Sequence, residues 1–333
     1  MTRSTLSVLV LLGAFALLCW LTPHVVLVIF AGALVAVGLR SLAAPVAIHL
    51  GLRGGWAVLL VSLALVLLFG VAAWAVAAPL SEQAGNFAES LPRTLQSLRE
   101  QVSQYGLGRW VLERVHPEQM IPSAGDAAGL AAAGLSGGVG VLGDIVLVVL
   151  LGIFLAAEPS LYRRGAVALL APALRPGGMY VLDQSGAALR GWLIGAMCAM
   201  AFNGTLVFLG LWALGVPLSG LLGVIAGLMS FVPYIGAFVA AVPAALVALG
   251  QDPSLLPWAL GLFCVVEAIE GNVLTPMVQK HTTDLPPGLL LAAQALAGAS
   301  LGVLGIILAA PLAAVAMTAI RAGYVEQRLE GEN

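Results

Sequence analysis

The feature that most constrains this chain is the length of its stretches without charged side chains. No Asp, Glu, Lys or Arg occurs at residues 4–39, 54–81, 191–251 or 285–320. Each stretch exceeds the roughly 20 residues that a helix needs to cross a bilayer. Only 9% of all residues are charged and 61% are hydrophobic, whereas soluble domains have about 25% charged residues. We therefore predict an all-α, polytopic membrane protein and exclude a soluble enzyme.

The pattern predicts about eight transmembrane helices in three regions. Residues 1–78 are expected to form the first three, the first being retained rather than cleaved as a signal peptide. A loop is expected at residues 40–53. Residues 79–135 predict a polar, extracytoplasmic insertion of amphipathic helices. Residues 136–333 are expected to form the C-terminal transmembrane region, with a span beginning at Val139 and a cytoplasmic amphipathic segment at 158–190.

Two apolar stretches, 216–249 and 286–320, are longer than one straight span and contain residues that disturb helices. The first contains Pro233, Tyr234 and Gly236, and the second contains Gly305 and Pro311. Proline cannot donate a backbone hydrogen bond, and glycine permits unusual turns. Irregular backbone at membrane depth is tolerated where it lines a cavity. We predict two kinked or re-entrant hairpins with these residues as gating or backbone positions, and single bent helices remain the alternative.

The distribution of arginine predicts the orientation of the chain. Short loops rich in Arg face the cytoplasm. With eight crossings the arginine-bearing segments share one side, so both termini are expected to be cytoplasmic. These segments contain Arg3, Arg40, Arg53, the stretch from Arg163 to Arg190, Arg321 and Arg328.

Two carboxylates inside an apolar stretch are the strongest functional signal. Glu267 and Glu270 are spaced to share a helix face, and an ionisable group at membrane depth costs roughly 2.5–3.5 kcal/mol and usually marks an ion or substrate path. Two such neighbours in a low dielectric do not both ionise readily, so one is expected to hold a proton. The alternative places them near the membrane surface, paired with Lys280 or an arginine.

Further polar residues complete the candidate binding set. Asn272 and Gln279 follow the carboxylates on either side of Pro276, where freed carbonyl groups could bind a cation or a hydroxylated solute. Asn203, Ser230 and Gln294 also lie in apolar segments, where amides more often form hydrogen bonds between helices. Of these three, we retain Asn203 as a candidate ligand.

Other classes of function are not supported. The histidines and cysteines show no metal-ligand spacing, so no metal or cofactor is predicted. The sequence has no phosphate-binding loop and no Ser-His-Asp set, which disfavours ATP-driven transport and catalysis by this chain. A net charge of −2 provides no basic field for nucleic acid.

Three motifs in the C-terminal half resemble the AI-2E (autoinducer-2 exporter-like) transporter family. They are Phe231-Val232-Pro233-Tyr234-Ile235-Gly236, Glu270-Gly271-Asn272-Val273-Leu274-Thr275-Pro276 and Leu304-Gly305-Ile306-Ile307-Leu308-Ala309-Ala310-Pro311. Shorter matches accompany them at Leu214-Gly215-Val216-Pro217, Val242-Pro243-Ala244 and Leu285-Pro286-Pro287. The resemblance implies a secondary or facilitative permease of the bacterial inner membrane, oligomeric and pentameric. Members of the family have been linked to export of the quorum-sensing signal autoinducer-2, and some to sodium/proton antiport.

Three hypotheses follow. The first is a transporter that exports a small polar solute such as autoinducer-2, coupled to protons or sodium through the intramembrane Glu residues, with 136–333 as the transport region. The alternative is a Na⁺(Li⁺)/H⁺ antiporter. The third is a non-transporting membrane scaffold. The expected partners are the lipid bilayer, the solute, H⁺ or Na⁺, and further copies of the chain.

Overall fold

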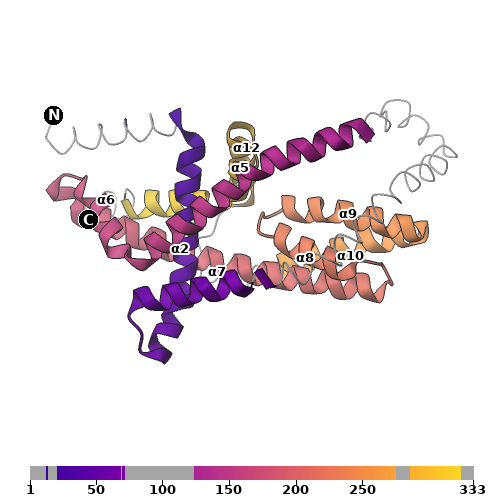
Figure 1. Cartoon of the computed structure of the whole chain (residues 1–333), viewed down its shortest axis with the longest axis horizontal. Helices are drawn as coiled ribbons and strands as arrows, with labels where there is room; N and C mark the ends of the chain where they lie inside the picture. The colour runs from indigo at the N-terminus through magenta and orange to yellow at the C-terminus, as the bar shows by residue number, and fades with distance from the viewer. Residues whose placement is uncertain (1–12, 14–20, 69, 72–123, 275–285, 324–333) are drawn as a thin grey trace.

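The structure is a computed structural model that describes residues 13, 21–68, 70–71, 124–274 and 286–323 (Figure 1). Every regular element in these ranges is helical and none is a strand, which confirms the all-α prediction. The elements are α2 (Pro23–Leu50), the helix Gly54–Leu68, α5 (Ala124–Ala157), α6 (Pro159–Ala168), η2 (Pro172–Leu174), α7 (Arg175–Ala213), α8 (Ser219–Met229), α9 (Ile235–Gln251), η3 (Pro253–Leu255), α10 (Leu256–Ile269), the π-helix η4 (Glu270–Leu274) and α12 (Pro287–Ile320).

Within the described ranges, four helices are long and apolar enough to cross a membrane. They are Pro23–Leu50, Pro172–Ala213, Pro253–Val273 and Pro287–Gly323, and a fifth span is reached if the bent α5–α6 pair is counted as one. Three shorter apolar helices accompany them: Gly54–Leu68, α8 and α9. The first expected span and most of the insertion at 79–135 lie outside the described residues, so the total of eight stays a prediction.

The loop expected at residues 40–53 is wrong. Helix α2 continues through this stretch to Leu50, and Gly51 ends it in the left-handed conformation (φ 63°) with its N–H bonded to the carbonyl of Ala47. The stretch after Arg40 is rich in alanine and leucine, which favour helix, and arginine favours helix as well. The charge of Arg40 therefore does not end α2. Glycine adopts the left-handed cap without steric strain.

Helix α5 also begins earlier than expected. It starts at Ala124 rather than at Val139 and crosses the proposed boundary between residues 135 and 136. The sequence from 124 to 138 is rich in alanine and contains no proline, and its glycines lower the stability of a helix without forcing it to end.

The amphipathic segment at 158–190 is divided between two helices. Its first part, α6, begins at Pro159 and lies at 90° to the end of α5. Its second part is the beginning of α7, which runs unbroken from Arg175 to Ala213. Proline has no N–H to continue the α5 hydrogen-bond ladder, and its fixed φ suits the first position of a new helix.

Three groups of buried apolar side chains hold the helices together. One joins α2, the helix Gly54–Leu68 and α5, a second joins α2, α7 and α12, and a third joins the C-terminal half of α7 with α8, α9 and α10. Helix α7 contributes to two of them, and Figure 1 shows it running beneath the α8, α9 and α10 group. The C-terminal half of α7 therefore positions the residues described next.

Both long apolar stretches are broken in the middle. The first divides into α8 and α9, and α12 is interrupted at Gly302 (φ 67°, ψ −151°). A Cβ atom at Gly305 would lie 2.3 Å from the carbonyl oxygen of Ala297, although these residues would be about 12 Å apart along a continuous helix at 1.5 Å per residue. The two parts of α12 therefore fold back on each other. Their placement as re-entrant hairpins in a bilayer stays a prediction.

Candidate functional site

Polar side chains from four segments meet where the broken helices pack together. We call this cluster the polar centre; it consists of Asn203 in α7, Ser230 after α8, Glu270 at the start of the π-helix, Gln294 in α12 and the carbonyl of Pro233. Asn203 and Gln294 are 3% and 1% exposed. These residues come from segments that are far apart in the sequence, so the cluster forms only when the helices pack together.

Asn203 connects three of these segments. Its Nδ2 donates to Oγ of Ser230 at 2.9 Å and to Oε2 of Glu270 at 2.5 Å. The hydroxyl of Ser230 in turn donates to the carbonyl of Ala226 at 2.8 Å. The amide nitrogen faces the carboxylate oxygen, which accepts the bond. The Oδ1 atom of Asn203 is consequently left buried without a hydrogen-bond partner in the described part of the chain.

Gln294 makes a similar bond to the turn between α8 and α9. Its Nε2 donates to the carbonyl oxygen of Pro233 at 3.0 Å, which again fixes the nitrogen toward an acceptor. Its Oε1 is buried and has no partner among the described residues. A buried, unsatisfied polar atom costs about 1–3 kcal/mol, and most such atoms in proteins are bonded to protein or ordered water. Each of these two amide oxygens is therefore a buried acceptor without a partner among the described residues.

The turn between α8 and α9 is strained and tightly packed. Tyr234 has φ 65° and ψ −53°, a conformation that costs a residue other than glycine about 1–3 kcal/mol. A Cβ atom at Gly236 would lie 1.9 Å from the carbonyl oxygen of Met229, so only glycine fits. These constraints hold the Pro233 carbonyl where Gln294 reaches it.

Glycines bring α7 and α8 close enough for Asn203 to reach Ser230. A Cβ atom at Gly204 would lie 3.1 Å from the Gly223 carbonyl oxygen, and one at Gly223 would lie 2.8 Å from the Gly204 carbonyl oxygen. Small residues permit this close approach of backbones in membrane helices.

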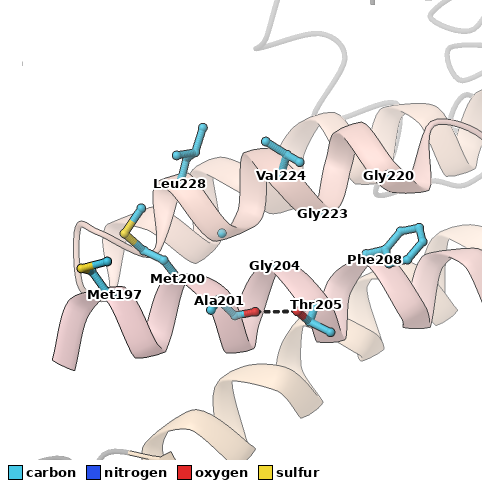
Figure 2. Close-up of a pocket in the computed structure, with 11 residues that line it drawn as sticks. Met197, Met200, Ala201, Gly204, Thr205, Phe208, Gly220, Gly223, Val224 and Leu228 are labelled. Carbon is cyan, nitrogen blue, oxygen red and sulfur yellow. Dashed lines mark hydrogen bonds between the residues drawn. The ribbon is translucent and has the colours of Figure 1, made fainter. Parts of the chain in front are cut away.

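A separate open groove of about 610 Å³ lies between α7 and α8 (Figure 2). Its side chains are mostly apolar, and the hydroxyl of Thr205 is bonded to the carbonyl of Ala201 in its own helix at 2.7 Å. The larger lining side chains are Met197, Met200, Phe208, Val224 and Leu228. The groove therefore offers no free polar side chain to a polar solute, unlike the polar centre.

The two carboxylates expected to act together differ in their surroundings. Glu270 is partly buried and bonded by Asn203, whereas Glu267 is half-buried and has no hydrogen bond or ion pair within the described ranges. The two like charges are near enough to interact. Glu270 lies in a π-helical turn, a distortion that is frequent at functional sites. Lys280, the alternative partner, lies outside the described residues.

The remaining predicted residues do not join the polar centre. Asn272 is exposed and its Nδ2 donates to the carbonyl of Ala268 at 2.7 Å. Gly305 and Pro311 are buried in the second part of α12, where they pack against apolar neighbours. Pro276 and Gln279 lie outside the described residues. Their roles in gating or binding stay predictions.

Ser230 and Gln294 are the members that sequence reasoning did not select as ligands. Their signal was that each is a single polar residue in an apolar stretch, which does not distinguish a ligand from a link between helices. In the described part of the chain, no three His, Cys, Asp or Glu residues are grouped as metal ligands would be.

These features define a class: a multi-pass helical membrane protein with a polar centre between broken helices. Residues 6–324 match the family described as AI-2E family transporter, and the chain belongs to this family.

Relatives in two organisms are named putative transport proteins. "Putative transport protein YueF" of Bacillus subtilis is 28% identical over 185 residues, covering 54% of this chain and 50% of YueF. YrrI of the same organism is 30% identical over 133 residues, covering 40% of this chain and 36% of YrrI. YhhT of Escherichia coli K12 is 33% identical over 117 residues, covering 34% of this chain and 33% of YhhT. The matched region thus spans half or less of these relatives.

Proposed function

We propose that this protein is a secondary or facilitative transporter, not an enzyme, that moves a small polar solute such as autoinducer-2 out of the cytoplasm. The observation that carries the proposal is the pair of buried amide oxygens without partners, Oδ1 of Asn203 and Oε1 of Gln294. A hydroxyl group of the solute that reaches either oxygen would donate to it. Apolar surroundings strengthen such bonds because water does not compete.

Glu270 is the proposed coupling residue. Its bond from Asn203 links the carboxylate to α7 and, through Ser230, to the α8–α9 turn. A proton or a sodium ion arriving at Glu270 would compete with the Asn203 amide for the carboxylate oxygens. Loss of that bond would weaken the contact between α7 and the π-helix, so the charge state of Glu270 and the packing of three segments would change together. Glu267 would tune this step through its like charge.

A Na⁺(Li⁺)/H⁺ antiporter is the second candidate. Hard cations prefer oxygen ligands, and the polar centre combines one carboxylate with two free amide oxygens. This version needs no organic solute. The scaffold hypothesis receives less support, because it expects carboxylates at the surface whereas Glu270 is partly buried and bonded.

The proposed location is the bacterial inner membrane with both termini cytoplasmic. Arg40, Arg163 and Arg190 line one cavity, and a shared arginine-rich end supports its assignment to the cytoplasmic face. A homo-oligomer, with a pentamer expected from the family, is part of the proposal; its mass in detergent, measured by light scattering, tests it.

Flux in proteoliposomes tests the function. Purified protein is reconstituted with autoinducer-2 inside, and efflux is measured with and without an imposed pH gradient or sodium gradient. The wild type is compared with Glu270→Gln, which removes the titratable group and retains the shape. Glu158→Gln is the matched control, because Glu158 is exposed at the α5–α6 bend and is not part of the polar centre.

We expect gradient-dependent efflux that is lost in Glu270→Gln and kept in Glu158→Gln. Efflux at the same rate with and without either gradient would indicate facilitated diffusion instead of coupled transport. Cation-driven proton movement without solute efflux would favour the antiporter. Equal flux in wild type and Glu270→Gln would overturn the role of Glu270.

A further inference from the structure

A cavity of about 460 Å³ lies away from the polar centre, between α2, the α5–α6 bend and the first part of α7. Figure 1 shows α6 and the start of α7 beside α2 at this end of the molecule. Its charged lining residues are Arg40 from α2, Arg163 from α6, and Asp183 and Arg190 from α7. Three positive charges and one negative charge therefore face one space.

Two of these arginines are uncompensated. The guanidinium of Arg163 is paired with the carboxylate of Asp183. Neither Arg40 nor Arg190 has a hydrogen bond or ion pair with any residue in the described ranges. Since the only acid of the lining is already paired, the cavity presents net positive charge to an incoming ligand.

The position of the cavity relative to the apolar stretches indicates its depth in the membrane. Arg40 directly follows one charge-free stretch, and Arg190 directly precedes another. Arg163 lies on α6, which leaves the end of α5 at 90°. The charge-free parts of α2 and α7 therefore both begin at this cavity, beside the end of α5, and the side chains of Arg40 and Arg190 lie where an apolar segment reaches the lipid headgroups.

The rest of the lining is apolar. Ala36, Val37 and Ala44 of α2, Leu155 of α5, and Leu182 and Ala187 of α7 form it. The hydroxyl of Ser41 is already bonded to the carbonyl of Val37 at 2.8 Å. A ligand that fits must therefore be anionic at one end and apolar next to it, which a soluble phosphate is not.

We propose that this cavity binds an anionic phospholipid, with Arg40 and Arg190 holding its phosphate and the apolar wall receiving the beginning of its acyl chains. Guanidinium groups recognise phosphate with paired hydrogen bonds. Basic pockets between helices at a membrane face suit such headgroups. The bound lipid would join α2 to α7 by bridging one arginine from each.

Native mass spectrometry of the full-length protein in detergent tests this proposal by titration with phosphatidylglycerol, phosphatidylcholine or inorganic phosphate. The test variant is Arg40→Gln/Arg190→Gln. The matched control is Arg53→Gln/Arg164→Gln, which removes two exposed arginines that do not line the cavity. A second test variant, Arg40→Lys/Arg190→Lys, keeps the charge.

We expect the test variant to bind phosphatidylglycerol roughly 30-fold more weakly, from about 1 kcal/mol per arginine. The control should stay within about twofold of wild type, and the lysine variant should lose less affinity than the glutamine variant, because it keeps the charge but not the paired hydrogen bonds. Equal losses in test and control would overturn the site, and so would equal affinity for phosphatidylcholine. Equal losses in the lysine and glutamine variants would overturn the assignment to charge. Displacement of the lipid by inorganic phosphate at low millimolar concentration would reassign the site to a soluble anion.

Discussion

The side-chain amide of Asn203 donates a hydrogen bond to the carboxylate of Glu270, 67 residues later in the chain. Asn203 lies inside α7, and Glu270 is the first residue of the π-helix that follows α10. The same nitrogen also donates to Ser230, so the amide has no donor left for another group. A single amide thus links three segments, and a change in the charge of Glu270 alters a hydrogen bond made by α7.

This link should be measurable as an energetic coupling. Asn203→Ala leaves Glu270 and Ser230 without their donor, so we expect it to lower the free energy of unfolding by about 1–3 kcal/mol. Combined with Glu270→Ala, the losses should fall short of additive by about 0.5–3 kcal/mol. Unfolding in mixed micelles by titration with SDS measures both quantities. Asn203→Ala combined with Glu158→Ala should be additive, and additivity in both pairs would contradict the link.

The glycine at the start of α9 should be irreplaceable. Gly236→Ala puts a methyl group 1.9 Å from the Met229 carbonyl oxygen, so the turn must shift, with a loss of about 1–3 kcal/mol or more. Gly261→Ala is the control, because nothing lies within 4 Å of that position in α10. It should be neutral or stabilising by about 0.5–1 kcal/mol. Thermal unfolding in detergent compares them, and equal melting temperatures would show that the turn is not tightly packed.

Gly302 should be required for its backbone conformation rather than for space. Its φ is 67° and ψ −151°, and nothing lies within 4 Å of a Cβ atom built there. Gly302→Ala should therefore cost about 1–3 kcal/mol through strain alone. Gly288→Ala, in the first turn of the same helix and equally open, should have no such effect. Thermal unfolding in detergent compares the two variants. Equal melting temperatures would show that α12 does not need the left-handed conformation at Gly302.

Substitution of Gln294 should lower solute flux with little effect on the free energy of unfolding. Gln294→Met removes the bond to the Pro233 carbonyl together with a buried acceptor that has no partner in the described part of the chain. These effects oppose each other, so the free energy of unfolding should change by less than about 1 kcal/mol. Solute flux should fall at least about tenfold if the free oxygen binds the solute. Gln251→Met changes an exposed glutamine and should leave flux unchanged; flux kept in Gln294→Met would exclude this side chain from the transport path.

Asp252 should make a small contribution to stability that depends on pH. The backbone N–H of Ser254 donates to its carboxylate at 2.9 Å and holds the pKa of this exposed group below its ordinary value. The contribution is therefore present above the ordinary pKa of about 4 and is lost as the pH falls through the lower value of the folded state. Asp252→Asn keeps an acceptor but does not titrate. Melting temperatures from pH 3 to 6 should decline less for this variant than for wild type, and parallel curves would contradict the assignment.

Much of the fold follows from local properties of the chain. The charge-free stretches predicted apolar helices, and the described helices Gly54–Leu68, α8, α9 and α12 lie in them, as do parts of α2 and α7. Pro233 and Gly236 predicted a break in the first long stretch, and the turn between α8 and α9 lies there. Such features are readable because hydropathy, the missing N–H of proline and the freedom of glycine act over a few neighbouring residues.

Helix ends were predicted less well. Helices α2 and α5 extend beyond the stretches expected for them, and α7 crosses the expected boundary at residue 190, since charged or small residues do not by themselves end a helix. The break in α12 lies at Gly302 rather than at Gly305 or Pro311, because neither needs an unusual backbone angle once the two parts pack together. These outcomes depend on neighbours that are distant in sequence.

The sequence by itself determined that this protein is helical, belongs in a membrane and carries Glu270 within an apolar segment. Only the tertiary structure decided that Asn203, Ser230 and Gln294 meet around the α8–α9 turn. The reason is physical: contacts between segments arise from close backbone approach, as at Gly204 and Gly223, and no local pattern encodes which polar residue will face which. The same holds for the cavity with Arg40 and Arg190, which lie in different helices and share a site because α2 and α7 pack together.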